Sequence, residues 1–489
     1  MSAQGRRRGA TAGRACVAVV AAMLCCTPAT AKLPFLNRHA DNSALLAGPP
    51  AGQVADATPG DGLLAQRRGY GVIVDATLER QLNDVLHDLQ RVLPEAPAPA
   101  HVYAMPDTEF RAYSTADGAI FIAMGMLQSL QSRDELAALL GHEYAHILLH
   151  HHAKGKGETV SQKLYGVGSL YLGLRGGKSN KITDDLLRKS LFNELALESV
   201  QSAVMPAMGR KQEDEADRLA ADLLVRAGYN PVAIVSFMDR MVEWEARNEE
   251  SASARETRTA ETTRLVTMSD KSMSLNLDKK MDGLVGIVGD VAAGGLALLR
   301  RRHYPASKRA EAVRDYMSSQ HGDADRPDER PIPWANDSEV QQLFAGVAAA
   351  HATAGALAGQ DANEAKALAA KASASPAARS PYVRFITTEA QGRDPEGRTL
   401  AALIQELDSP DSVFALHYLV LDTLTRSDPE KALAVLDHSR KALDDPPELL
   451  PYSVRLNKKA GHKEAANLYL VKCTAYGDRG LAQACQKEQ

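Results

Sequence analysis

The sequence has few aromatic residues, few cysteines and no excess of positive charge. Phe, Trp and Tyr make up 5% of its 489 residues, and Trp occurs only twice. The formal net charge of −4 gives no support for nucleic-acid binding, which needs a basic surface. Apolar residues at 45%, charged residues at 24% and abundant Ala are typical of a globular, helix-rich chain. At this length we expect two or more domains.

Long uninterrupted hydrophobic runs are also lacking. The apolar stretch Ala15–Cys26 is too short to span a bilayer comfortably. It follows three arginines at 6–8 and precedes a small-x-small cleavage site at Ala29-Thr30-Ala31, an order typical of an export signal. We therefore predict a signal peptide at 1–31, and its loss would leave a net charge of −8. A retained N-terminal anchor is the alternative.

Cysteine becomes scarcer still once this signal is removed. Of the five cysteines, only Cys473 and Cys485 remain. In an oxidising compartment these two can form a disulfide that closes a short loop at the C-terminus. Two unpaired thiols are the alternative.

Residues 69–318 are predicted to form the first folded domain, after a flexible tether at 32–68 that is rich in Ala, Gly, Pro and Asp. Apolar residues recur at helical spacing from Leu78 to Leu89, and a strand is expected to follow. Gly118–Leu127 is predicted to be a further strand that ends in a turn. Ser132–Leu149 is predicted to be a helix with Ser132 as its N-cap.

One apolar stretch of this domain is ambiguous. Gly283–Leu299 is short, rich in Gly and interrupted by Asp290. These features favour a lid or a peripheral membrane contact, and a transmembrane helix is the alternative.

Residues 336–489, after a predicted linker at 319–335, contain a weak repeat. Glu396, Glu430 and Glu464 are each 34 residues apart, and two apolar pairs share this spacing. Thirty-four residues is the period of helix–turn–helix repeats of the tetratricopeptide type, which stack into a curved array with a concave binding face. An irregular helical bundle is the alternative.

Chemistry is concentrated in His142-Glu143-Tyr144-Ala145-His146, which has the pattern H-E-x-x-H. The spacing of four places His142 and His146 on one helix face, one turn apart, so both rings can bind one zinc ion. Glu143 beside them can take a proton from a water on the metal and pass it to a leaving amine. Two ordinary core histidines are the alternative.

A third ligand is needed, and one source is a further histidine. His152 occupies the last position of H-E-x-x-H-x-x-G-x-x-H, but Leu149 stands where that pattern needs a Gly to turn the chain. A continuing helix would carry His152 to another face. We therefore expect His150, His151 and His152 to be the polar end of the helix.

The other source is an acidic cluster, Glu213, Asp214, Glu215 and Asp217, at the start of a predicted helix that ends at Gly228. Glu213 and Asp217 are four residues apart and share a face. One of them can bind zinc while the other accepts the free N–H of a ligand histidine. Acidic residues also stabilise helix N-termini, which alone would explain any one of the four.

The segments "DELAALLGHEYAHILLHHH" and, further along, "QEDEADRLAADLL" resemble the zinc metallopeptidase (gluzincin) family that contains HtpX, the CAAX prenyl proteases and periplasmic BepA. The resemblance implies a mainly α fold, with an α+β zincin-type protease domain that has a small sheet, followed by the helical-repeat domain. It also implies one Zn²⁺ per chain, held by His142, His146 and Glu213. Asp217 would support a ligand, and Glu143 would be the catalytic residue.

Two further stretches extend this resemblance. "RHYPASKRAEAVRDY" is similar to the family's His-Pro element followed by an Arg, with Tyr304 inserted between His303 and Pro305. In BepA-like members this His can occupy the open position of the metal, so His303 is a candidate regulatory or transition-state residue. The insertion leaves open whether His303 or Tyr304 faces the zinc. "EFRAYSTADGAIFIAMGML" resembles the family's strand before the active-site helix, and such a strand can pair with an extended substrate.

These features predict an exported, periplasmic zinc endopeptidase that cleaves misfolded or misassembled envelope proteins in outer-membrane protein quality control. The repeats would bind substrate or the outer-membrane assembly machinery. The chain lacks the long apolar spans of HtpX and the prenyl proteases, which favours the periplasmic branch of the family. A chaperone or scaffold with a blocked or idle protease site is the alternative. A purely structural zinc domain is disfavoured, since such a site has no need of Glu143 as a base.

Overall fold

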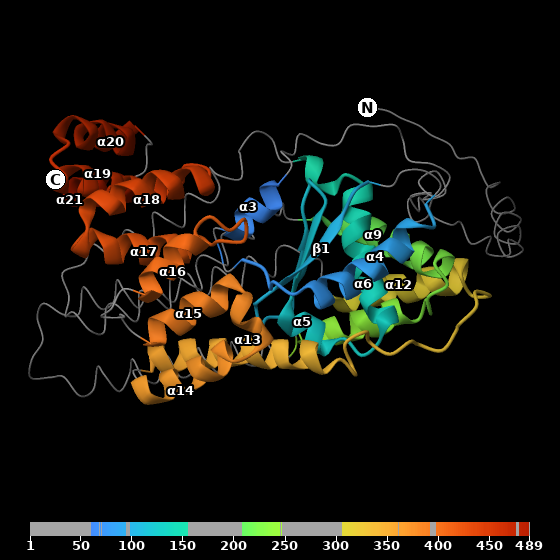
Figure 1. The fold of residues 1–489 in the computed structure, drawn as a ribbon. Coiled ribbons are helices and arrows are strands. Elements are labelled where there is room, and N and C mark those ends of the chain that lie inside the picture. Colours follow the sequence, from blue (N-terminus) through green and yellow to red (C-terminus); the bar gives the residue numbers. More distant parts are fainter. Residues whose placement is uncertain are drawn as a thin grey trace, which may run out of the picture. The chain divides into compact units, whose positions relative to one another are not determined.

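The computed structural model describes residues 60–67, 69, 71–93, 98–154, 208–244, 246, 306–359, 361–391, 398–475 and 479–488 (Figure 1). The predicted signal peptide at 1–31, most of the tether at 32–68, the stretch Gly283–Leu299 and the His303–Pro305 element lie outside these residues. Within them the fold is mainly helical and contains one small three-stranded sheet, which confirms the predicted fold class.

The elements fall into two groups along the chain. The first group contains α3 (Asp61–Arg67), α4 (Ala76–Gln90), β1 (His101–Met105), β2 (Ala112–Ser114), β3 (Ala119–Ala123), α5 (Met124–Ser129), α6 (Arg133–Leu148), the 3₁₀ helix η1 (His151–Lys154), α9 (Arg210–Arg226), a helix at 233–244 and α12 (Ala306–Gln320). The second group contains α13 (Ser338–Ala358), α14 (Ala362–Ser373), η2 (Pro376–Arg379), α15 (Pro381–Gln391), α16 (Arg398–Glu406), α17 (Phe414–Ser427), α18 (Pro429–Ala442), η3 (Pro447–Leu449), α19 (Leu450–Lys459), α20 (Lys463–Ala475) and α21 (Arg479–Lys487).

The sheet has the strand order β1-β3-β2. Strand β3 is parallel to β1, with Val102 opposite Ile120, and antiparallel to β2, with Tyr113 opposite Phe121. All five residues of β3 are buried, as expected for a central strand covered on both faces. Strand β2 is consequently an edge of the sheet, and helix α6 packs against both β2 and β3.

The helix predicted from Leu78 to Leu89 and the strand after it are confirmed as α4 and β1. Asp75 caps α4, because its carboxylate accepts hydrogen bonds from the amides of Thr77 and Leu78. The turn predicted at the end of β3 is wrong, since Met124–Ser129 forms helix α5 and buries three of its side chains. The last part of the expected tether also forms a helix, α3, whose residue Gln66 is buried.

Helices α6 and α9 pack directly against each other and position the functional residues (Figure 1). The side chain of Ser132 accepts a hydrogen bond from the Glu135 amide and caps α6, as predicted. A Cβ atom on Gly141 would lie 3.4 Å from both Cα and Cβ of Ala220, so the two helices touch at a pair of small residues. Helix α9 ends before Gly228, which has a φ of +68° and is the predicted end point.

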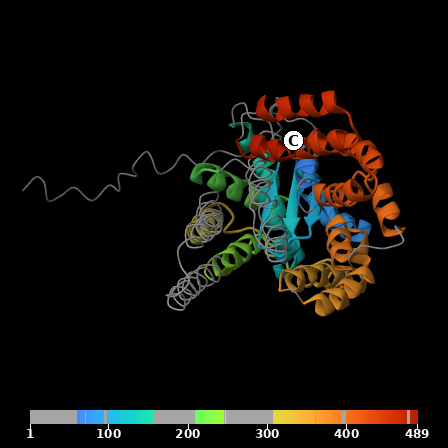
Figure 2. The same cartoon turned by 90° about the vertical axis from the view of Figure 1, so that its left-hand side faces the viewer.

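The C-terminal helices form consecutive pairs, α17 with α18 and α19 with α20. Helix α18 begins at Pro429 and α20 begins at Lys463, so the spacing of 34 residues recurs in their starting points. Ala432 and Ala466 occupy equivalent positions in these helices, and both are buried. Figure 2 shows the helices from α13 onward, orange to red, following one another in a curved row. This arrangement is compatible with the tetratricopeptide-like repeat, which stays a prediction.

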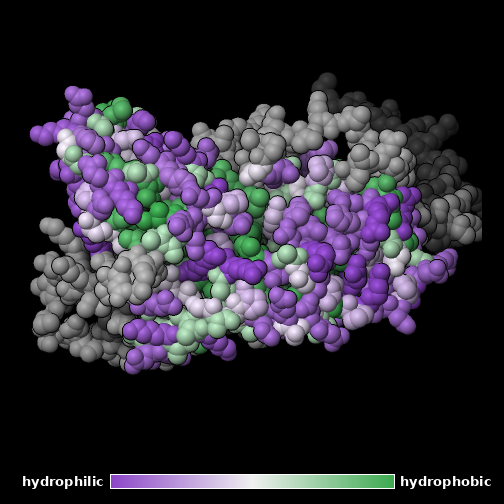
Figure 3. Space-filling view, viewed as in Figure 1, coloured by the Kyte–Doolittle hydropathy of each residue, from purple (hydrophilic) through white to green (hydrophobic). Residues whose placement is uncertain are grey.

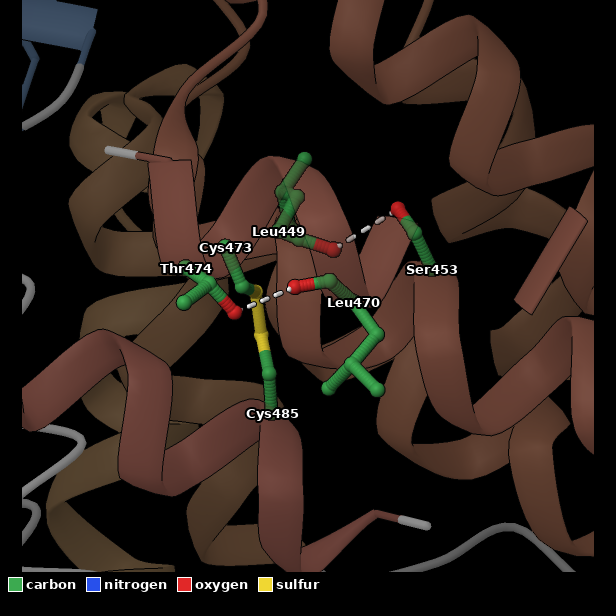
Figure 4. Close-up of a disulfide and its surroundings, with 6 residues drawn as sticks. All are labelled: Leu449, Ser453, Leu470, Cys473, Thr474 and Cys485. Atoms are coloured by element: carbon green, nitrogen blue, oxygen red, sulfur yellow. Dashed lines mark hydrogen bonds between the residues drawn. A yellow bond between two sulfur atoms is a disulfide. The ribbon is translucent and has the colours of Figure 1, made fainter. Parts of the chain in front are cut away.

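A disulfide joins Cys473 of α20 to Cys485 of α21 (Figure 4). Both cysteines are buried in a small apolar cluster together with Leu450, Val454 and Leu481. The bond therefore ties the last helix to the one before it. Figure 3 shows hydrophilic residues over much of the described surface, with hydrophobic patches near the C-terminal helices.

Candidate metal centre

Three buried side chains converge where α6 meets α9. The Nε2 atoms of His142 and His146 are 3.1 Å apart. Glu213 of α9 faces both of them, with Oε2 at 3.6 Å from His142 Nε2 and Oε1 at 3.9 Å from His146 Nε2. Among the described residues, His142, His146 and Glu213 form a group whose potential ligand atoms lie close enough together to hold a metal ion. We call these three residues the ligand group.

The chemistry and spacing of these donors fit one zinc ion. Zinc binds imidazole nitrogen and carboxylate oxygen at about 2.0–2.2 Å, and a tetrahedral arrangement then separates the donors by about 3.4 Å. The observed separations of 3.1, 3.6 and 3.9 Å bracket this value. Three protein ligands leave a coordination position for water or substrate, which is the pattern of catalytic rather than structural zinc sites.

Asp217 contacts the first candidate ligand histidine, His142. Its Oδ1 lies 2.8 Å from His142 Nδ1, so the Nε2 atom of that ring is directed at the ligand group. Burial alone would raise the pKa of Asp217, but the charges and hydrogen bonds of Arg309 and His142 outweigh it and lower the pKa to about 2. The carboxylate is therefore charged at neutral pH, as an acceptor of the histidine N–H should be.

Arg309 of α12 completes the site from a third helix. Its side chain is 1% exposed and donates from Nε and Nη2 to the two oxygens of Asp217, at 2.9 and 2.7 Å. Its Nη1 atom lies 3.1 Å from Oε2 of Glu213. Burial would lower the pKa of Arg309, but the carboxylates of Asp217 and Glu213 raise it. A single guanidinium thus neutralises two buried acids.

Sequence reasoning missed the place of Arg309 at the site. The available signal was the Arg that follows the His-Pro element, which is Arg309 in this sequence. His303 lies outside the described residues, and α12 begins at Ala306.

The structure also distinguishes among the four acids at the start of α9. Glu213 belongs to the ligand group and Asp217 lies behind His142. Asp214 instead lies 3.8 Å from Arg210, and Glu215 contacts Lys211 and His151. The helix period explains this result, because positions four residues apart face the same side.

Glu143 lies beside the ligand group without belonging to it. Its Oε2 atom accepts a hydrogen bond of 3.0 Å from the hydroxyl of Ser114, the last residue of edge strand β2. The side chain of Glu143 is therefore held between the active-site helix and the sheet edge. Glu143 is 4% exposed, so it lies in the same buried environment as the ligands.

The prediction that His150, His151 and His152 form the polar end of a helix is wrong. Helix α6 ends at Leu148, His150 adopts a left-handed φ of +51°, and the chain turns into η1. The prediction assumed that the helix continues for lack of a Gly, whereas a non-glycine residue makes the turn here. The turn brings both following histidines back against the site.

His151 and His152 contact different parts of the centre. The Nδ1 atom of His151 lies 2.8 Å from Nδ1 of His146, and His151 is 5% exposed. The Nε2 atom of His152 lies 3.3 Å from the Ser114 hydroxyl. Burial lowers the pKa of His151, and burial together with the charge of His151 lowers the pKa of His152 to about 4. Neither ring joins the group of ligand atoms.

Comparison with known proteins places this site in a family. Residues 75–317 match the model of peptidase family M48, and the matched segment contains every residue of the centre. This segment is a peptidase family M48 domain. The buried group of His142, His146 and Glu213 is the candidate metal site of this M48 metalloprotease domain.

Curated relatives resemble part of the chain. The beta-barrel assembly-enhancing protease of Escherichia coli K12 is 23% identical over 186 residues, which are 38% of this chain and 37% of the relative. The protein of the same name from Yersinia pestis is 22% identical over 185 residues, again 38% and 37%. A Vibrio cholerae relative is 24% identical over 181 residues, 36% of this chain and 35% of its own. The chain therefore matches little more than a third of the length of these relatives.

Among the helices that the structure describes, none combines the length and the apolar character needed to cross a membrane.

Proposed function

We propose that this chain is an exported, zinc-dependent endopeptidase that hydrolyses peptide bonds of misfolded or misassembled envelope proteins. The observation that carries the proposal is the placement of Glu143, held by Ser114 at 3.0 Å beside the buried His142–His146–Glu213 group. A general base next to three metal ligands is the arrangement of a hydrolytic site, and a structural zinc site would not need it.

Glu143 is proposed to be the base and acid of the reaction. Zinc, when bound, supplies Lewis-acid polarisation of the substrate carbonyl and lowers the pKa of water. The carboxylate of Glu143 takes a proton from the attacking water and later delivers it to the leaving amine. Ser114 fixes one carboxylate oxygen by its hydrogen bond and so limits the rotamers that Glu143 can adopt.

The edge strand β2 is the proposed binding surface for the substrate backbone. Ser114 ends this strand and contacts Glu143, so a peptide that pairs with β2 would pass beside the base. Edge strands present unpaired backbone donors and acceptors and bind extended peptides by adding a strand. Such recognition reads the main chain, which suits a protease that acts on unfolded segments of many sequences.

The C-terminal helices are proposed to form tetratricopeptide-like repeats that bind substrate or the outer-membrane assembly machinery. Support comes from the 34-residue offset between α18 and α20, the buried Ala432 and Ala466, and the curved row of helices in Figure 2. The names of the E. coli and Yersinia relatives refer to beta-barrel assembly, which suggests this class of substrate and a periplasmic location. The Cys473–Cys485 disulfide agrees with an oxidising compartment.

A chaperone or scaffold with a blocked protease site is the second candidate. It is favoured by the burial of Glu143, which is 4% exposed, together with that of all three ligands. In this second role the buried Glu143 would not meet a substrate. His303 remains a candidate for the blocking residue, as the resemblance to BepA-like members implies.

Cleavage of an unfolded outer-membrane protein tests the two candidates. The wild-type mature chain, Glu143→Gln and His303→Ala would be compared for zinc content and for the rate of cleavage. The proposal expects zinc in all three and cleavage that Glu143→Gln abolishes. If all three proteins bind zinc but none, including His303→Ala, shows Glu143-dependent cleavage, the endopeptidase hypothesis is wrong and the scaffold hypothesis is favoured.

A further inference from the structure

His146 contacts a second histidine behind the metal centre. Its Nε2 atom faces His142 Nε2 and the carboxylate of Glu213, while its Nδ1 atom lies 2.8 Å from Nδ1 of His151. The other nitrogen of His151, Nε2, lies 3.4 Å from Oε2 of Glu215. Glu215, His151 and His146 therefore form a continuous chain of polar contacts that ends at the ligand group.

The proton positions along this chain follow from the contacts. A histidine that binds metal through Nε2 must carry its proton on Nδ1, so His146 donates to the Nδ1 lone pair of His151. His151 then carries its own proton on Nε2 and donates it to Glu215. Each ring nitrogen of His146 and His151 thus has one role, and both rings are neutral while Glu215 is a carboxylate.

The backbone is built to hold His151 in this place. The left-handed turn at His150, with φ of +51°, reverses the chain after α6 and returns the next residue to the ligand helix. The side chain of Gln212 donates from Nε2 to the backbone oxygen of His151, at 3.2 Å, and so anchors the turn to α9. The position is thus determined by contacts with both helices of the site.

The two ligand histidines are consequently supported in different ways. His142 contacts the carboxylate of Asp217 directly, at 2.8 Å, whereas His146 reaches Glu215 only through His151. Resting on the function proposed above, we propose that His151 is a positioning residue for the metal centre. It holds His146 in the tautomer and orientation that present Nε2 to zinc, and Glu215 in turn holds His151.

Zinc affinity, measured by competition with a chelator, tests this role separately from proteolysis. His151→Ala removes the acceptor for His146 and is expected to weaken zinc binding by about ten- to a hundredfold. His151→Asn keeps an acceptor at the δ position and is expected to recover most of that loss. Circular dichroism and thermal unfolding would confirm that both variants are folded.

Control variants separate this role from general effects of the turn. His150→Gly removes the neighbouring imidazole but permits the left-handed φ, and it should bind zinc like the wild type. Lys211→Ala removes only the exposed partner of Glu215 and should also be neutral.

Three results would overturn the inference. An affinity of His151→Ala within twofold of wild type would show that His146 needs no support, and equal losses in His151→Ala and His151→Asn would show that packing rather than the hydrogen bond matters. A folded wild type that binds no zinc would remove the metal centre itself. Zinc binding that depends on His151 in a chain without protease activity would instead overturn the proposed function and leave this inference standing.

Discussion

Arg309 and Asp217 form a two-point ion pair inside the protein, with the guanidinium Nε and Nη2 atoms 2.9 and 2.7 Å from the two carboxylate oxygens. Arg309 comes from α12 and Asp217 from α9, so the pair joins helices that are far apart in sequence. The same guanidinium contacts the candidate ligand Glu213 at 3.1 Å. The candidate metal centre is therefore part of a buried charge network, and loss of this network should affect the fold as well as the chemistry.

Replacing Arg309 with Ala should destabilise the protein by about 3–5 kcal/mol, because it leaves two buried carboxylates without their cation. Chemical denaturation of the metal-free protein measures this effect without a contribution from zinc. Arg314→Ala is the matched control on the same helix, since its ion pair with Asp239 is half exposed and should contribute less than about 1 kcal/mol. Similar losses in the two variants would contradict a structural role for the network.

Gly141 should tolerate Ala but not a larger side chain. A Cβ atom there would lie 3.4 Å from Ala220, which is an ordinary contact, and Ala is the better helix former. Val would add atoms that push α9 away from α6 and separate Glu213 from the two histidines, at a cost of about 1–3 kcal/mol. Unfolding midpoints and zinc affinities of Gly141→Ala and Gly141→Val would check this, and a Val variant with normal zinc affinity would contradict it.

The local parts of the site could be predicted from the sequence, and the tertiary parts could not. The spacing of four residues places His142 and His146 on one face of their helix. The same spacing places Glu213 and Asp217 on one face of α9. Choosing Glu213 as a ligand required the resemblance to a family, because the approach of α9 depends on small residues such as Gly141 and Ala220.

The end of α6 shows a second limit of prediction. Neither Gly nor Pro marks the turn at His150, whose left-handed conformation is unfavourable by itself. Tertiary contacts, such as that of His151 with His146, offset this cost. The prediction of a polar helix end for His150, His151 and His152 therefore fails, and His151 is buried. The fold class could be predicted more easily, because helix periodicity and capping residues such as Ser132 depend on the local sequence.

His417 should make the folded state sensitive to acid. It is buried between the hydroxyls of Ser412 and Ser439, and burial, with smaller effects of the charges of Arg67 and His438, lowers its pKa to about 3. The folded state therefore keeps this ring neutral, while the unfolded chain takes up a proton below about pH 6.5. Acid thus favours unfolding, and the free energy of unfolding should fall by about 1.4 kcal/mol per pH unit from this group between pH 6 and pH 4.

Urea denaturation at several pH values, compared between wild type and His417→Gln, isolates this contribution from those of other buried histidines. The variant should start less stable at pH 7 and lose less stability on acidification. Parallel pH profiles for the two proteins would show that His417 is not held neutral by the fold.

The most direct test of the account is the number of zinc ions bound per chain in variants of the acidic cluster on α9. We predict one zinc ion per chain in the wild type and in Asp214→Asn, because Asp214 lies 3.8 Å from Arg210 and is not among the candidate ligands. We predict loss of zinc in a folded Glu213→Gln variant, because a neutral amide replaces the carboxylate that faces both His142 and His146. Retention of a full equivalent of zinc by Glu213→Gln, or absence of zinc from the folded wild type, would contradict the assignment of this site.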